Sequence, residues 1–139
     1  MNVNIKWNQG MELTGEAETG HTVIMDAAEA SGGQNKGFRP TALIALGAAG
    51  CSSMDVLSIL RKKKINISAY ECKVNVESYQ EDHPHVFTKM HLEYIVTGKD
   101  IKRKDVERAV ELSESKYCQG IAMMKKTAEV THTITIIEE

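Results

Sequence analysis

The chain has 139 residues, of which 42% are hydrophobic and 26% charged, and its formal net charge is −2. These values are typical of one globular domain, so a single domain spanning 1–139 is expected. Charges of both signs alternate along the chain, which argues against a nucleic-acid partner, because such proteins concentrate basic residues on one face. The one basic run, RKKK at 61–64, is explained by the preference of cations for the last turn of a helix.

The apolar runs in the sequence are short. None approaches the roughly 20 residues that span a bilayer, and the start, MNVNIKWNQGMELTG, lacks the regions of a secretory signal. These features predict a cytoplasmic protein with no membrane partner. In a reducing cytoplasm the three cysteines, at 51, 72 and 118, are not expected to form a disulfide framework.

The N-terminal third predicts three short strands followed by a loop. The segments VNIKWN, MELTGEAE and HTVIMDA show partial alternation and are separated by QG and TG turn signals, which indicates an antiparallel meander. Residues 27–39, AAEASGGQNKGFR, are rich in glycine and lack periodicity. They predict a long loop, and loops of that length are often functional.

A helix is expected from Pro40 to about Lys63, because proline is favoured in the first helical turn. Its apolar residues recur at three- and four-residue steps, while alanine and serine occupy the other faces, which predicts burial nearly all round. Gly47 and Gly50 each cost about 1 kcal/mol relative to alanine in a helix. We therefore expect another backbone, such as a crossing helix, to approach them closely.

The remainder predicts a hairpin, two helices and a last strand. AYECKVNVESYQ and HVFTKMHLEYIVTG alternate and are joined by EDHP. An amphipathic helix follows from Asp100 or Lys102, then a shorter helical piece, CQGIAMMKKT. The strand AEVTHTITIIEE places four residues on one face: Val130, His132, Ile134 and Ile136. The predicted class is α+β, with the order βββ-α-ββ-α-α-β.

The residues that could carry chemistry are cysteines and histidines. A lone cysteine is most often a small buried hydrophobe. His83, His85 and His91 lie in and after the hairpin turn without ligand spacing, which favours solvated side chains over a metal site. A metal site of Cys51, Cys118 and His132 would require the fold to bring all three together. No metal or other cofactor is expected.

The combination of a loop, a proline, TALIALGAAGCSSMDVLSIL, a hairpin and AVELSESKYC resembles the OsmC-like family, which includes osmotically induced OsmC proteins and organic hydroperoxide resistance proteins. The resemblance covers nearly the whole chain. Its most specific elements are the small-residue helix with Cys51 and the MDV after it, and Cys118, 67 positions later. It implies an α+β intertwined homodimer, with two central helices wrapped by two six-stranded antiparallel sheets.

The resemblance also implies a thiol-dependent peroxidase of the stress response, which reduces organic hydroperoxides with a thiol reductant. Cys51 would attack the O–O bond and become a sulfenic acid, and Cys118 would resolve it as a disulfide. Small residues around Cys51 would let two central helices pack closely and leave a narrow cavity for substrate. Cys72 alternates with Tyr70 and Val74 in a strand and is expected to be a packing residue.

The sequence departs from the pattern of the peroxide-reducing members at two places. They carry a glutamate one or two positions after the proline, where this chain has Thr41 and Ala42, and a proline after the resolving cysteine, where it has Gln119. Their glutamate holds an arginine beside the attacking cysteine, and here Arg39 is the only arginine before Pro40.

The alternatives differ in what surrounds Cys51. Arg39 lies about 18 Å from Cys51 along a continuous helix, so it could activate Cys51 only from the partner subunit. The alternative function is a noncatalytic dimer of the same fold that binds a small apolar or thiol-bearing ligand. An arginine within hydrogen-bond reach of Cys51 favours the enzyme, whereas a purely apolar cavity favours binding.

Overall fold

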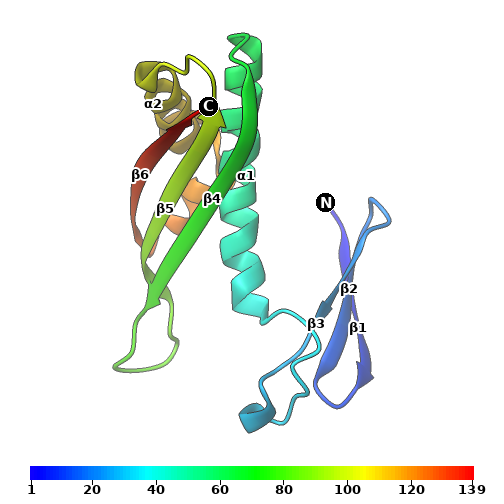
Figure 1. Ribbon diagram of the computed structural model, residues 1–139. Helices are drawn as coiled ribbons and strands as arrows, with labels where there is room; N and C mark the ends of the chain where they lie inside the picture. The colour runs from blue at the N-terminus through cyan, green and yellow to red at the C-terminus, as the bar shows by residue number, and fades with distance from the viewer. The chain divides into compact units, whose positions relative to one another are not determined.

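The computed structural model describes residues 1–139 as two compact units, Met1–Ile44 and Ala45–Glu139 (Figure 1). The order of helices and strands confirms the predicted βββ-α-ββ-α-α-β. The elements are β1 (Val3–Gln9), β2 (Glu12–Ala17), β3 (Thr22–Met25), α1 (Pro40–Lys62), β4 (Ile67–Ser78), β5 (Phe87–Gly98), α2 (Arg103–Leu112), α3 (Gln119–Met124) and β6 (Glu129–Glu138). Two short turns join them: the 3₁₀ turn η1 (Glu29–Ser31) and the π-helical turn η2 (Ser113–Tyr117).

The first unit contains the predicted meander. Strands β1, β2 and β3 pair in that order, and both pairings are antiparallel. Every residue of β1 is exposed, including the apolar side chains of Val3, Ile5 and Trp7, which alternate on one face of the strand. The first unit therefore provides little cover for β1.

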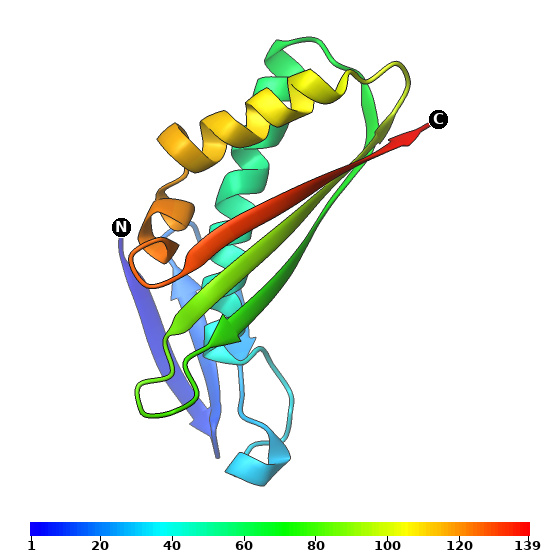
Figure 2. The same cartoon turned by 90° about the vertical axis from the view of Figure 1, so that its left-hand side faces the viewer.

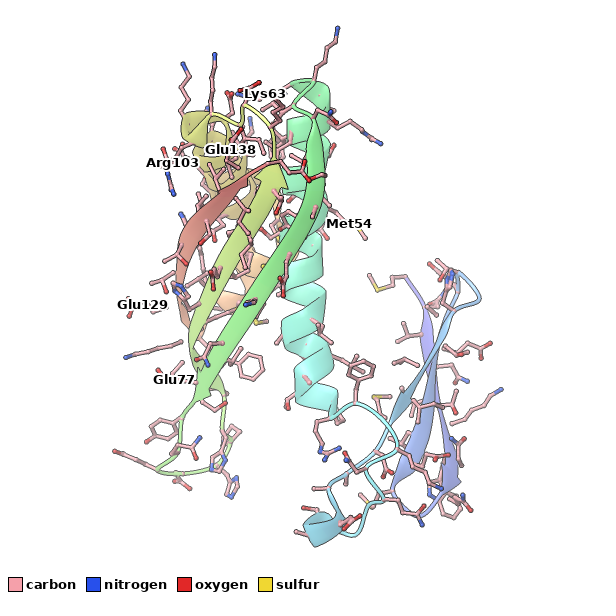
Figure 3. All side chains as sticks on the ribbon, in the orientation of Figure 1. Met54, Lys63, Glu77, Arg103, Glu129 and Glu138 are labelled. Atoms are coloured by element: carbon pink, nitrogen blue, oxygen red, sulfur yellow. The ribbon has the colours of Figure 1, made fainter.

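Helix α1 begins and ends where the sequence predicts, but it is not buried all round within this chain. Its buried residues form one stripe, which consists of Ala48, Ala49, Ser52, Val56 and Leu60. Leu46 and Met54 are 51% and 75% exposed, and Figure 3 shows Met54 projecting away from the sheet of the second unit. The sheet and short helices of the second unit cover only one side of α1.

The glycines of α1 do not meet a backbone within this chain. A Cβ atom built on Gly47 or Gly50 would have no neighbour within 4 Å. The close approach occurs instead at Gly120 of α3, where a Cβ would lie 2.7 Å from the Cα atom of Ala48. The small residues of α1 thus serve contact with α3 on one side and leave the Gly47–Gly50 side open.

The second unit is a three-stranded sheet, in the order β4-β5-β6, with the helices on one face (Figure 2). The predicted hairpin is confirmed as the antiparallel pair β4 and β5. The expectation of wholly antiparallel sheets is wrong for β6, which runs parallel to β5. After β5 the chain crosses the sheet through α2, η2 and α3 before β6 begins, and such a crossover makes neighbouring strands parallel.

The core of the second unit lies between this sheet and the helices. Side chains that alternate along β5 are fully buried, as are apolar residues of α1, α2 and α3. The largest of these buried side chains are Tyr94, Leu60, Met90, Leu92, Ile121, Val56, Val96, Val106 and Val110. Val130, Ile134 and Ile136 of β6 pack against the same core, which confirms the predicted inward face of that strand.

Candidate active site

The structure brings Cys51 and Cys118 together. Cys51 lies on α1 and is half-buried, whereas Cys118 is the N-cap of α3 and is 3% exposed. The two thiols are close enough that Cys51 helps to raise the pKa of Cys118, although they are 67 positions apart in the sequence. The Cys118 Sγ atom also lies 3.7 Å from the carbonyl oxygen of Ala48 and accepts the backbone N–H of Ile121 at 3.3 Å. Both cysteines are free thiols.

Cys118 is a protonated thiol at neutral pH. Burial raises its pKa to about 11, and the neighbouring Cys51 contributes in the same direction. The backbone N–H groups of Ile121 and Gly120 oppose this shift only in part. Since a thiolate and not a thiol is the nucleophile toward peroxides, Cys118 is unsuited to attack one directly.

A cluster of buried hydroxyl groups lies beside the thiol pair. The Ser52 Oγ atom is 2.6 Å from the Tyr94 hydroxyl and 2.9 Å from the Ser113 Oγ atom. Ser113 donates to Asp55 Oδ2 at 3.0 Å, and Tyr94 donates to Glu114 Oε1 at 3.3 Å. This cluster was not predicted from the sequence.

Glu114 continues the cluster toward the surface. Its Oε2 atom lies 2.7 Å from Nδ1 of His132 on β6, and its backbone carbonyl accepts the Lys125 ammonium at 3.0 Å. Thus His132 pairs with a carboxylate and does not lie in a cluster of metal ligands. No group of three or more His, Cys, Asp or Glu side chains is placed to hold a metal ion.

Cys72 occupies a separate position. It is half-buried and packs against the core from β4, as the sequence predicts. Burial raises its pKa, while hydrogen bonds with Ser53 and Tyr70 act in the opposite direction. The Tyr70 hydroxyl donates to Ser53 Oγ at 2.8 Å, so a second tyrosine–serine bond joins the sheet to α1 here.

In the first unit, Arg39 is fixed by the loop that precedes it. Its Nη2 atom donates to Asn35 Oδ1 at 3.0 Å, and its Nη1 atom lies 3.5 Å from the carbonyl oxygen of Asp26 and 3.4 Å from that of Gly37. Asn35 adopts a left-handed backbone with φ of 54°. The guanidinium is therefore anchored on several sides within its own unit.

Asp26 organises this loop from inside. The residue is 4% exposed, and its carboxylate accepts the backbone N–H groups of Ala27 at 2.7 Å and of Gln34 and Lys36 at 3.1 Å each. Desolvation acts to raise the pKa of Asp26, but these three N–H groups and the nearby Arg39 outweigh it and lower that pKa. Sequence reasoning missed Asp26, because its bonds exist only once the loop has closed.

Comparison with known proteins identifies the family. The OsmC-like protein family matches residues 33–133. The chain belongs to the OsmC-like family. It is 36% identical to Protein YhfA of Escherichia coli strain K12 over 137 residues, which cover 99% of this chain and 98% of that protein.

Solved structures agree with this assignment. A structural-genomics structure is 34% identical, covers 100% of both chains and superposes with a TM-score of 0.83. The organic hydroperoxide resistance protein OsmC from Legionella pneumophila is 18% identical, with 97% of each chain covered and a TM-score of 0.71. At that identity the second comparison shows a shared fold.

Membership in the OsmC-like family also explains why α1 is so apolar. By length and composition alone this helix could cross a membrane, since its best 18-residue window has a mean hydropathy of 1.8, so the short apolar runs were too weak a reason to exclude a span. The core helix of a soluble protein has the same properties. In this OsmC-like chain α1 carries Cys51 and packs against the sheet and α3 of the second unit.

The residues that depart from the peroxide-reducing pattern lie at the starts of α1 and α3. Thr41 and Ala42 are exposed at the start of α1, and neither carries a carboxylate. In those members the glutamate holds the arginine, and here Asp26 of the preceding loop is the carboxylate that helps to hold Arg39. It does so indirectly: its carboxylate binds backbone N–H groups of the loop, and the Arg39 guanidinium contacts main-chain oxygens. Gln119, in place of proline, is the first residue of α3.

The other histidines considered as metal ligands have different neighbours. His83 and His85 stack with ring centroids 4.2 Å apart in the exposed turn between β4 and β5. His91 contacts the hydroxyls of Thr131 and Thr133 on β6.

Proposed function

We propose that this OsmC-like protein is a cytoplasmic, homodimeric thiol peroxidase that reduces organic hydroperoxides, with Cys51 as the attacking thiol and Cys118 as the resolving thiol. The proximity of the two thiols, with Cys118 Sγ 3.7 Å from the carbonyl oxygen of Ala48 in the helical turn before Cys51, is the observation that carries the proposal. Membership in the OsmC-like family, together with a fold shared with an organic hydroperoxide resistance protein, supports it.

The assignment of roles rests on protonation and exposure. Cys118 is almost fully buried and its pKa is raised, so it remains a thiol at neutral pH. Cys51 is the more accessible of the pair, and a hydroperoxide can reach it more readily. Cys51 therefore suits the first step and Cys118 the second.

The proposed reaction oxidises Cys51, forms a disulfide with Cys118 and ends with reduction of that disulfide. The Cys51 thiolate attacks the terminal oxygen of the hydroperoxide, the O–O bond breaks, and the alkoxide leaves and takes up a proton to become an alcohol. The Cys118 sulfur then attacks the sulfur of the Cys51 sulfenic acid, and the hydroxyl group leaves with the Cys118 proton as water. A dithiol reductant returns two electrons and regenerates both thiols.

The homodimer is proposed from the surfaces that the chain leaves open. The apolar face of β1 and the Gly47–Gly50 side of α1 are exposed in one copy. A second copy that covers both would bury more than the roughly 2,000 Å² at which obligate interfaces begin. It would also close a cavity over the half-buried Cys51.

Activation of Cys51 is proposed to come from Arg39 of the partner subunit. Fixing the Arg39 guanidinium through Asn35 and the Asp26 loop supports this, because an anchored cation costs little to place beside a thiolate. Alkylation of Cys51 as a function of pH should give a higher thiol pKa in Arg39→Ala than in the unchanged protein. Arg108→Ala, at a surface arginine paired with Glu111, is the control and should change nothing.

The test of the function is consumption of cumene hydroperoxide by the purified protein with a dithiol reductant. Cys51→Ser should abolish turnover, Cys118→Ser should lose the intramolecular disulfide and turn over only as fast as the dithiol itself reduces the Cys51 sulfenic acid, and Cys72→Ser should behave like the unchanged protein. Consumption by the unchanged protein no faster than by Cys51→Ser would refute the peroxidase.

A noncatalytic OsmC-like dimer that binds a small apolar or thiol-bearing ligand is the second candidate. The lack of a carboxylate at Thr41 and Ala42, where the peroxide-reducing members carry their glutamate, favours it. Retention of a small thiol such as a mercaptocarboxylic acid by Cys51→Ser, without peroxide consumption by the unchanged protein, would support this candidate.

A further inference from the structure

A serine near each of the two cysteines is hydrogen-bonded to the other: Ser52 follows Cys51, and Ser113 precedes Cys118. Ser52 comes directly after Cys51, and the carbonyl oxygen of Ser113 accepts the backbone N–H of Cys118 at 2.8 Å. The side chains of Ser52 and Ser113 meet at 2.9 Å, and both are fully buried. The segment that carries each thiol is thus joined to the other by a buried hydroxyl pair.

Tyr94 and two carboxylates complete this hydroxyl cluster. Ser113 donates to Asp55 on α1, Tyr94 donates to Glu114 on η2, and the single Ser52 proton is donated to either the Tyr94 or the Ser113 oxygen. A carboxylate at each end accepts a hydrogen bond and requires no proton of its own. The second unit has no buried side-chain nitrogen or oxygen without a partner. Every polar atom of the cluster therefore has a partner, and such networks favour one arrangement of the groups that they join.

The backbone before Cys118 is short and irregular, and apart from the hydroxyl cluster its tertiary hydrogen bonds are those of Glu114 with His132 and Lys125 near the surface. Residues Ser113–Tyr117 form a π-helical turn between α2 and α3, and π turns are rare and concentrate at functional sites. α3 has only six residues, so its own hydrogen bonds contribute little to its position. The close contact of Gly120 with Ala48 fixes α3 on one side of Cys118, and the hydroxyl cluster fixes η2 on the other.

Resolution of a sulfenic acid depends on this kind of positioning. Disulfide geometry requires Cα atoms about 4.4–6.8 Å apart, and a sulfenic acid that waits for its partner can be oxidised further to a sulfinic acid. A shift of η2 by a fraction of that range would slow bridging without affecting attack on the peroxide, which needs only Cys51.

We propose that the cluster of Ser52, Tyr94 and Ser113 is a positioning device that holds Cys118 against Cys51, so that disulfide formation outruns over-oxidation. The biological role of this cluster rests on the proposed peroxidase function. Its three members are positioning residues, since none touches the peroxide.

The chain offers matched controls. Tyr70 and Ser53 form a bond of the same kind, 2.8 Å long, between β4 and α1, and it does not involve the segment before Cys118. Ser52→Ala and Tyr94→Phe should therefore be compared with Ser53→Ala and Tyr70→Phe. Tyr94→Phe keeps the aromatic ring in the core, so it remains informative if Ser52→Ala does not fold.

The experiment follows Cys51 by mass spectrometry after one equivalent of cumene hydroperoxide, with dimedone added to trap the sulfenic acid. Thiol loss at Cys51 should proceed at the same rate in all five proteins. Ser52→Ala and Tyr94→Phe should form the Cys51–Cys118 disulfide about tenfold more slowly, the factor that loss of one buried hydrogen bond allows, and accumulate dimedone adduct and sulfinic acid. Bridging as fast as in Ser53→Ala and Tyr70→Phe would overturn the proposal.

A second oxidant separates this inference from the proposed function. Diamide joins two thiols without a peroxide, and the same two variants should bridge Cys51 to Cys118 about tenfold more slowly with it. Failure of the unchanged protein to react with cumene hydroperoxide, with slowed diamide bridging in the variants, would refute the peroxidase and support the positioning device. Equal diamide bridging in all five proteins would refute the device itself.

Discussion

The two sheets of this OsmC-like chain have the same number of strands and very different surroundings. In the sheet of β4, β5 and β6, alternate residues of β5 are fully buried beneath the helices. In the sheet of β1, β2 and β3, every residue of β1 is exposed. Strand alternation is present in both, so the pattern tells which face is apolar but not which part of which chain will cover it.

The largest difference between the sheets should appear when an apolar side chain is removed. Leu92→Ala, in the core of the second unit, should lower the free energy of unfolding by about 2–5 kcal/mol, because a cavity forms where the side chain is fully buried. Urea unfolding followed by circular dichroism measures the loss. A loss under 1 kcal/mol would mean that the β4–β6 sheet is not a packed core.

The corresponding change in the first sheet should act on assembly. Ile5→Asp places a charge on the apolar face of β1, and in the proposed homodimer it should raise the dimer dissociation constant by about 100-fold or more. Analytical ultracentrifugation over a range of concentrations gives that constant. Lys6→Asp, which introduces the same residue on the opposite face, should have little effect. Equal behaviour of the two variants would show that no second copy covers this face.

Glycine substitutions sharpen the comparison along α1. Gly120→Ala should destabilise the protein by about 1–3 kcal/mol, because the new Cβ would meet the Cα atom of Ala48 at 2.7 Å. Gly47→Ala and Gly50→Ala meet nothing in one chain, where alanine should add about 1 kcal/mol of helix stability each. In the proposed dimer they should instead weaken association. Ultracentrifugation and thermal unfolding together reveal the sign, and tighter association would contradict a helix packed on this side.

The smallest expected effect concerns acid and the loop of the first unit. Since the pKa of Asp26 is lowered in the folded protein, its stabilisation is present above the ordinary aspartate value of about 3.9 and is lost as the pH falls through the lower, folded value. NMR amide shifts of Gln34 and Lys36 should titrate with a midpoint below 3.9, and this transition should vanish in Asp26→Asn. A midpoint above 3.9 would contradict the bonds described for this carboxylate.

Local signals predicted most elements of the fold. Pro40 marked the start of α1, and alternation on both sides of EDHP marked the β4–β5 hairpin. The direction of β6 was not predictable from its own residues, because it depends on how α2 and α3 return the chain across the sheet. The contacts of Gly47 and Gly50 were not predictable either, since a helix pattern does not say which molecule supplies the neighbour.

The candidate site was predictable where it rests on family motifs. Cys51 and Cys118 were found together because two motifs, each weak alone, occur in one chain. Tyr94 was indistinguishable from an ordinary core aromatic, and Ser52 and Ser113 from helix-surface serines, because their bonds join residues 42 and 61 positions apart. Polar contacts of this kind follow from the tertiary fold and leave no periodic trace in the sequence.

The placement of Cys118 within the crossover after β5 has a consequence for biosynthesis. At roughly 5–20 residues per second, a ribosome needs about 3–13 s to add the 67 residues from Cys51 to Cys118. During that interval the nascent chain carries Cys51 without the thiol that would protect its sulfenic acid. In a cell under oxidant stress, newly made copies would be more vulnerable to irreversible oxidation at Cys51 than finished ones, and pulse-labelled protein should carry the larger share of sulfinic acid.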